Sequence, residues 1–228
     1  MKFISTTLLA TSLAASLLVA ASDEDIQRLK ESGNVLSEIQ SVPDKGIPND
    51  LFHKASCVVV IPGMKKAGFI FSGKYGRGYA SCRKAAGGWT IPAGMRIEGG
   101  GFGLQAGGSA TDVVMLVMSK KGMEGLLSSK FTLGGEASVA AGPVGREATA
   151  QTDATMKADI LSWSRSRGVF GGLSLEGGTL RPDEDANNSL YASKVTSKDI
   201  LTGKVTKAAP SDELITKLVE YAGSEQMK

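Results

Sequence analysis

The residues that could do chemistry are few and far apart in this chain. Its one histidine, His53, would have to serve any Ser-His-Asp site, and no GxSxG motif is present. A metal ion needs clustered His, Cys or carboxylate ligands, whereas Asp183–Asp185 is a consecutive run without the alternate spacing of a calcium loop. We therefore predict no catalytic constellation, no metal site and no cofactor.

Two short motifs match enzyme signatures but lack the context that those enzymes need. Ser81–Lys84 reads SxxK, the nucleophile motif of penicillin-interacting enzymes, but the SDN and KTG elements are missing and the segment is strand-like. Gly101–Ala106 is similar to a dinucleotide fingerprint, but the strand-like TDVVMLVM follows where a helix is required. An envelope hydrolase is left as a remote alternative, and loss of an activity in His53→Ala would be its sign.

A basic segment with apolar neighbours is the strongest candidate binding surface. It begins in a predicted loop tip after Pro62-Gly63 and continues into the next strand. Cations beside apolar side chains can bind an anionic bilayer, and ordinary solvated lysines of a hairpin are the alternative. The predicted lipid contacts are four cations and two apolar residues: Lys65, Lys66, Lys74, Arg77, Met64 and Phe69.

The first residues predict export. Residues 1–21 contain one lysine, an apolar run and then small residues, which is typical of a secretory signal peptide cleaved after Ala21. An uncleaved anchor helix is the alternative. We expect a periplasmic or secreted protein, peripheral on the membrane. The formal net charge of +3 and the aromatic content of 6% give no support for nucleic-acid binding.

Two cysteines lie in strand-like segments, Cys57 in ASCVVVIP and Cys82 in GYASCRK. An oxidising compartment would permit a disulfide between them. Two buried free thiols that pack as small apolar side chains are the other interpretation. Neither cysteine belongs to a CxxC pair, so we expect no redox role.

Asp112 is the only charged residue of the glycine-rich and then apolar stretch Gly99–Ser119. A buried, unpaired carboxylate is costly, so this side chain must be exposed, paired or hydrogen-bonded. We predict a structural acid that caps backbone amides, with Arg96 or Arg165 as its charged partner.

The periodicity of apolar residues indicates one α+β domain over residues 22–228. Asp23–Gln40 has helical spacing, and the segments that follow Ser56 alternate as strands between turn glycines. The chain contains 29 glycines, and glycine within a strand marks a bend or a close approach of backbones. We predict a strongly bent antiparallel sheet or small barrel, short peripheral helices, an amphipathic N-terminal helix and a C-terminal helix.

Several segments, in order, are similar to those of the SYLF-domain family, in its bacterial lipid-binding branch. The resemblance covers about residues 26–223. The matching segments are Ala55–Gly78, Trp89–Gly94, Gly99–Met118, Lys130–Arg146, Ser162–Leu180 and Asn187–Tyr191.

The resemblance implies a bent β-domain with helices around it and a shared activity in phospholipid binding. Eukaryotic members are similar to phosphoinositide readers, and some bind actin filaments. We therefore expect a non-enzymatic envelope protein that binds an anionic phospholipid membrane, with helix Asp23–Gln40 and the basic segment as its contacts. The alternative is a protein–protein interaction module, either scaffolding an unidentified envelope protein or binding a filament.

Overall fold

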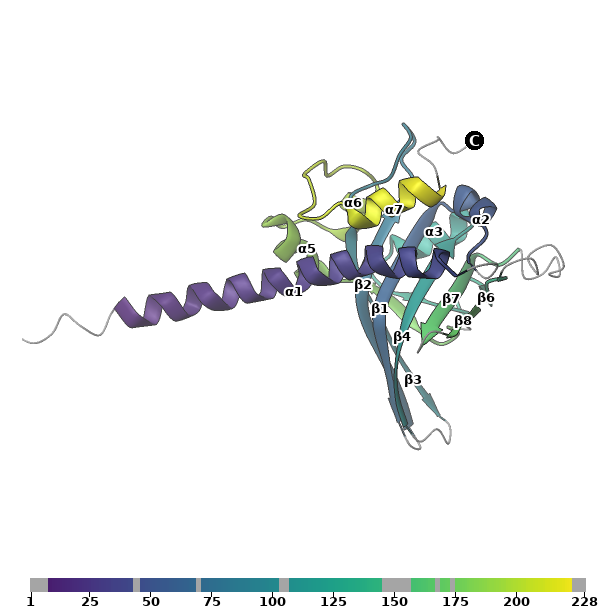
Figure 1. The fold of residues 1–228 in the computed structure, drawn as a ribbon, viewed down its shortest axis with the longest axis horizontal. Coiled ribbons are helices and arrows are strands. Elements are labelled where there is room, and N and C mark those ends of the chain that lie inside the picture. Colours follow the sequence, from purple (N-terminus) through teal and green to yellow (C-terminus); the bar gives the residue numbers. More distant parts are fainter. Residues whose placement is uncertain are drawn as a thin grey trace, which may run out of the picture.

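The framework of the protein is one sheet of nine strands that curls on itself (Figure 1). The computed structural model describes residues 8–42, 46–68, 71–102, 107–144, 157–166, 169–172 and 175–222. The strands are β1 (Cys57–Gly68), β2 (Phe71–Cys82), β3 (Ala93–Phe102), β4 (Gly107–Val117), β5 (Phe131–Thr132), β6 (Val139–Ala141), β7 (Ile160–Ser166), β8 (Val169–Gly172) and β9 (Thr179–Pro182). They follow the order β5-β9-β3-β2-β1-β4-β7-β6, and β8 pairs with β7. Pairing is antiparallel except between β6 and β7, which confirms the predicted bent sheet and α+β class.

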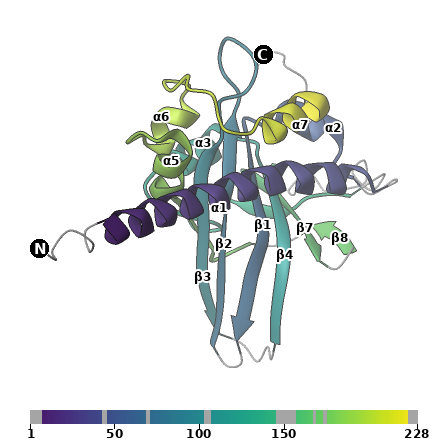
Figure 2. The ribbon, with the colours of Figure 1, turned by 60° about the vertical axis from the view of Figure 1, so that its left-hand side comes forward.

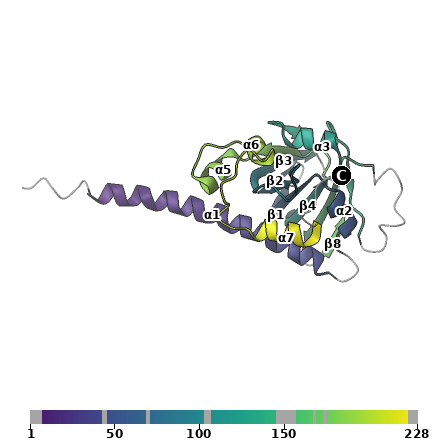
Figure 3. The same cartoon turned by 90° about the horizontal axis from the view of Figure 1, so that it is seen from above.

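Helices cover the sheet on both sides. They are α1 (Leu8–Gln40), α2 (Asn49–Lys54), α3 (Lys120–Leu126), α5 (Glu184–Tyr191), α6 (Ser197–Leu201) and α7 (Glu213–Ala222). α1 packs against α7, β1 and α5, while α3 lies on the other side of the sheet from α1 (Figure 3). Gly33 allows the close crossing of α1 and α7, because a Cβ there would lie 3.0 Å from the backbone of Glu213 and Leu214.

The core forms on both faces of the central strands. Alternate residues of a strand face opposite sides, so Val58 and Val60 face one layer and Val59 faces the other. All three are buried. On the helical side, the hydroxyl of Tyr79 donates to the carbonyl of Asp25 at 2.8 Å, which joins β2 to α1.

The N-terminal helix differs from its prediction at its start. It begins at Leu8 and runs without a break through the expected start near Asp23, so no helix N-terminus forms there (Figure 2). Leu29, Leu36 and Ile39 are fully buried. The apolar side chains of this part of the helix therefore pack against the protein itself, and its expected role as a membrane contact stays a prediction. In the described part of the chain, no helix has the length and apolar character needed to span a bilayer.

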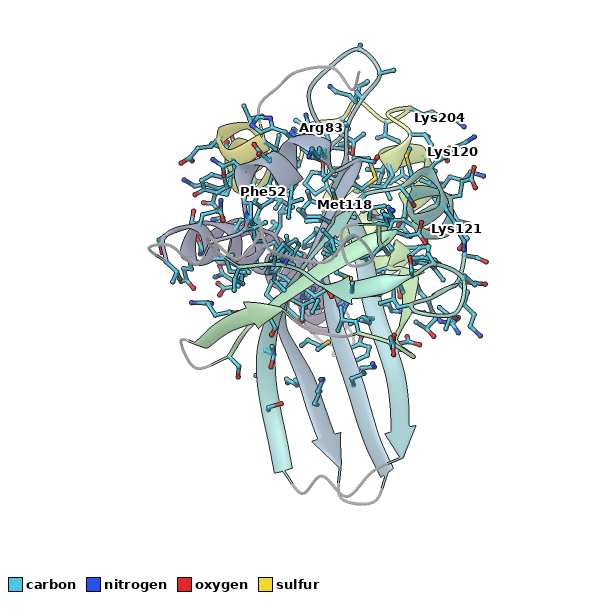
Figure 4. The ribbon with its side chains drawn as sticks, turned by 90° about the vertical axis from the view of Figure 1, so that its right-hand side faces the viewer. Phe52, Arg83, Met118, Lys120, Lys121 and Lys204 are labelled. Carbon is cyan, nitrogen blue, oxygen red and sulfur yellow. A yellow bond between two sulfur atoms is a disulfide. The ribbon has the colours of Figure 1, made fainter. Side chains whose placement is uncertain are left out.

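Arg83, which follows β2, joins one end of the sheet to α2 and α7. Its Nη2 donates to the carbonyl of Phe52 at 3.1 Å and to that of Ala222 at 2.6 Å, and its Nε donates to that of Ala55 at 3.1 Å. Figure 4 shows Arg83 and Phe52 at the end of the molecule opposite the projecting strands, with Lys120, Lys121 and Lys204 along one side of that end.

Candidate functional site

Four strands continue past the rest of the sheet and project from the body of the molecule (Figures 1 and 2). The pairing of β3 with β9 stops at Glu98, and the pairing of β4 with β7 stops at Asp112. Beyond these residues, β1 to β4 pair only with one another. We call this end the strand projection, and its described residues are 65–68, 71–75, 99–102 and 107–110.

Small residues leave the strand projection exposed. The described small side chains that reach solvent there are Ala67, Gly73, Gly100, Gly108, Ser109 and Ala110. Such residues bury little apolar surface, so the backbone ladder between the strands holds this region together. The larger described side chains therefore dominate what a partner would contact.

Three lysines and a tyrosine occupy the two faces of the strand projection. Lys65 pairs with Tyr75 across β1 and β2, and Lys66 pairs with Lys74. Because side chains directly opposite each other share a face, Lys65 and Tyr75 lie on one face and the other two lysines lie on the opposite face. Tyr75 is 49% exposed, one of two exposed large hydrophobic residues in the described chain. Each face thus presents positive charge.

Lys74 is held along the sheet surface. Its Nζ donates to the carbonyl of Glu176 at 3.1 Å. Its stem crosses Gly99, where a Cβ would lie 2.4 Å from the Cε of Lys74. Burial, followed by the neighbouring Lys66 ammonium, lowers the pKa of Lys74. In the described part of the chain, none of the three lysines of the strand projection forms an ion pair with a carboxylate.

Two of the six predicted lipid contacts are engaged within the protein. Met64 is fully buried, because an irregularity of β1 between Ile61 and Met64 turns its side chain inward beside Gly76. Arg77 lies in the body of the protein, where its Nε donates to Asp183 at 2.5 Å and its Nη2 lies 3.5 Å from Asp25. The hydrogen bond to Asp183 raises the pKa of Arg77. Phe69 lies outside the described residues.

Asp112 links three strands and a helix. Its Oδ1 accepts from the N–H of Gly63 at 2.8 Å, and its Oδ2 accepts from Arg165 Nη2 at 2.8 Å. Arg165 also forms an ion pair with Glu38 of α1. The other expected partner, Arg96, contacts Glu98 instead.

The other residues that the sequence singled out form structural contacts or lie on the surface. Cys57 and Cys82 form a disulfide between β1 and β2, at the end of the hairpin far from the strand projection. Ser81 is buried within β2 and donates to the carbonyl of Thr90 at 2.7 Å, so it does not begin a helix. His53 is exposed on α2. Among the described residues, no group of three or more His, Cys, Asp or Glu side chains could hold a metal ion.

Tyr75 is the member of the site that sequence reasoning missed. It lies between Lys74 and Arg77, and its exposure follows from the pairing of β1 with β2. A predicted register of the β1–β2 hairpin in which Lys65 lies opposite Tyr75 would have indicated that Tyr75 belongs to the site.

Comparison with known proteins identifies the family. The family described as "Ysc84: Las17-binding protein actin regulator" matches residues 98–221, more than half of the chain. This chain belongs to the Ysc84, or SYLF-domain, family. The chain is 39% identical over 171 residues to the SH3 domain-containing protein PJ696.02 of Schizosaccharomyces pombe, a match that covers 74% of this chain and 40% of that protein.

Members of the Ysc84 family from other organisms give similar matches. Protein YSC84 of Saccharomyces cerevisiae is 34% identical over 180 residues, covering 78% of this chain and 38% of the relative. The SH3 domain-containing YSC84-like protein 1 of Bos taurus is 30% identical over 191 residues, covering 81% and 56%. The chain thus spans between about two fifths and somewhat over half of these relatives.

Proposed function

We propose that this chain is a non-catalytic binding module that attaches to an acidic surface of a protein partner through its strand projection. The observation that carries the proposal is the gathering of Lys65, Lys66, Lys74 and Tyr75 on a protruding sheet end, with no carboxylate paired to these lysines among the described residues. Unpaired cations on a protruding surface steer association with a negatively charged partner. Tyrosine adds a large contact area with a polar end.

The names of relatives support a protein as the partner. The family description names Las17 and actin, and one relative in Saccharomyces cerevisiae is called LAS seventeen-binding protein 3. We propose that the partner of this chain is of the same kind, a protein of actin assembly or one with a comparably acidic surface.

An anionic phospholipid membrane is the second candidate. It is favoured by the presence of lysine on both faces of the strand projection, because a projection that enters a headgroup layer would present cations on each side. Export after cleavage at Ala21 and a periplasmic location belong to this candidate and stay predictions. The N-terminal sequence of the protein isolated from its native cells tests them.

Co-sedimentation separates the two candidates. We expect the purified chain to bind filamentous actin or immobilised Las17, with binding that weakens as salt is raised. Vesicles of phosphatidylglycerol and of phosphatidylcholine form the lipid arm. Binding to phosphatidylglycerol vesicles without binding to either protein would replace the protein partner by a membrane, and no binding in any arm would contradict both.

A further inference from the structure

A polar cleft opens on the helical side of the sheet, next to the strand projection. Its volume is about 390 Å³, and α1, α5, β2 and β3 line it. Small-molecule sites start at about this size, so the cleft suits a ligand of few atoms. Tyr75 contributes to its lining and is also part of the strand projection.

Carboxylates dominate one part of this polar cleft. Glu24 and Asp25 of α1 and Asp183 and Asp185 at the start of α5 line it. Arg77 is already engaged with Asp183 at 2.5 Å and faces Asp25 at 3.5 Å, and Glu24 pairs with Arg28. Asp185 is exposed and has no hydrogen-bond or ion-pair partner among the described residues. A negative charge is therefore left over at this end.

Arg96 and Ser189 line the other part of the polar cleft. Arg96 lies between Arg77 and Arg181 across three neighbouring strands, and Arg96 and Arg181 share one carboxylate, that of Glu98, at 2.9 and 3.5 Å. Two guanidinium groups thus share a single carboxylate. The buried Oγ of Ser189 on α5 forms no hydrogen bond, and buried polar atoms are nearly always hydrogen-bonded, so this hydroxyl indicates a missing partner.

These two parts define the ligand. A simple anion would be repelled by four carboxylates against two guanidinium groups in the lining. A simple cation would leave the hydroxyl of Ser189 unpaired and would be repelled by Arg96, which shares the carboxylate of Glu98 with Arg181. We propose that the polar cleft binds a small zwitterion, with its ammonium beside Asp185 and Tyr75 and its phosphate or carboxylate on Arg96 and Ser189. An ammonium over the tyrosine ring gains a further cation–π attraction.

Isothermal titration of the full chain tests the charge pattern. The probes are two zwitterions, phosphoethanolamine and alanine, and two halves, ethanolamine and inorganic phosphate. We expect at least one zwitterion to bind about tenfold or more tightly than either half, because both ends of the cleft contribute. If ethanolamine or inorganic phosphate alone bound as tightly as the zwitterions, or if neither zwitterion bound, the proposal would be overturned.

Two variants test the residues without disturbing the fold. Ser189→Ala removes a hydroxyl that makes no hydrogen bond, and Asp185→Asn neutralises an exposed carboxylate without a partner. We expect each variant to weaken the binding of the zwitterion by up to about tenfold and to leave the melting temperature of the protein unchanged. The distant Lys120→Gln serves as the control and should bind normally. Wild-type affinity in both cleft variants would rule out this cleft as the site.

Two further measurements identify the source of the zwitterion and show whether its site is independent of the strand projection. Binding to phosphatidylethanolamine vesicles that free phosphoethanolamine displaces would identify a lipid headgroup. Binding of the free zwitterion alone would identify a soluble metabolite. The double variant Lys65→Glu/Lys66→Glu should lose the protein partner of the proposed function and keep the zwitterion, so failure of one proposal is distinguishable from failure of the other.

Discussion

Asp112 of β4 accepts a hydrogen bond from the backbone N–H of Gly63 in β1, with 2.8 Å between the two atoms. Gly63 lies where the register of β1 shifts against β4, between Ile61 and Met64. A bulged residue leaves its backbone groups out of the ladder, so its N–H needs another acceptor. The carboxylate of Asp112 therefore stabilises the point at which the strand projection leaves the body of the protein.

Substitution of Asp112 should separate its two contacts. Asp112→Asn retains an oxygen for Gly63 but loses the charge that pairs with Arg165, and we expect a loss of about 1 kcal/mol in the free energy of unfolding. Asp112→Ala loses both contacts and should cost about 2–3 kcal/mol. Urea denaturation measures both values. Equal stability of Asp112→Ala and the wild type would show that the contacts do not hold this bend.

Substitution by alanine at two glycines of β2 should change the free energy of unfolding by very different amounts. A Cβ at Gly78 would lie 1.9 Å from the carbonyl oxygen of Val60, a backbone atom that cannot move aside cheaply. At Gly73, nothing lies within 4 Å. We expect Gly78→Ala to destabilise the protein by more than about 3 kcal/mol, or to prevent folding, and Gly73→Ala to stay within about 0.5 kcal/mol.

Thermal denaturation of the two glycine variants makes this comparison. Because both positions lie in one strand, β propensity is matched between them. A stable Gly78→Ala protein would mean that β1 and β2 are not packed as closely as described.

Tyr79 should make the protein sensitive to alkali. Burial raises the pKa of Tyr79, whose neutral hydroxyl donates to the carbonyl of Asp25. Above the ordinary tyrosine pKa of about 10, the unfolded chain releases this proton while the folded chain keeps it. The unfolded state then binds fewer protons, so the free energy of unfolding falls as pH rises.

Tyr79→Phe checks this dependence. The variant should lose about 1 kcal/mol near neutral pH through its missing hydrogen bond. Between about pH 9 and pH 11, its free energy of unfolding should fall less steeply than that of the wild type. Parallel slopes in the two proteins would contradict the assignment. Tyr191, whose pKa burial also raises, keeps part of the slope in both proteins.

Local signals made much of the fold predictable. The acidic start of α5 was visible in the sequence, and Asp183 does cap it by accepting from the N–H of Ala186 at 3.3 Å. The strand-like segment Trp89–Pro92 does not form a strand, since β3 begins at Ala93 and Trp89 pairs with Arg83 in an isolated bridge outside the strands. Within the strand-like segment Leu133–Ala141, only Val139–Ala141 forms a strand, β6, because a turn at residues 134–136 separates it from β5.

The site was less predictable because it depends on contacts distant in the sequence. Lys65 and Lys66 were found from their position after Pro62-Gly63. The burial of Met64 follows from the irregularity in β1, because a shift of one residue in a strand reverses the side of the sheet that a side chain faces. The engagement of Arg77 depends on Asp183, 106 positions further along the chain. No local pattern in the sequence indicates such a partner.

Charge reversal of two lysine pairs tests the central claim most directly. The measurement is the affinity of the chain for the protein partner found by co-sedimentation, compared between Lys65→Glu/Lys66→Glu and the matched control Lys120→Glu/Lys121→Glu. Both change the charge of two adjacent lysines, but the control pair begins α3, away from the strand projection (Figure 4). We predict a loss of about tenfold or more for the first variant and wild-type affinity for the second. Equal effects of the two variants, or an unchanged affinity in the first, would contradict the strand projection as the binding surface.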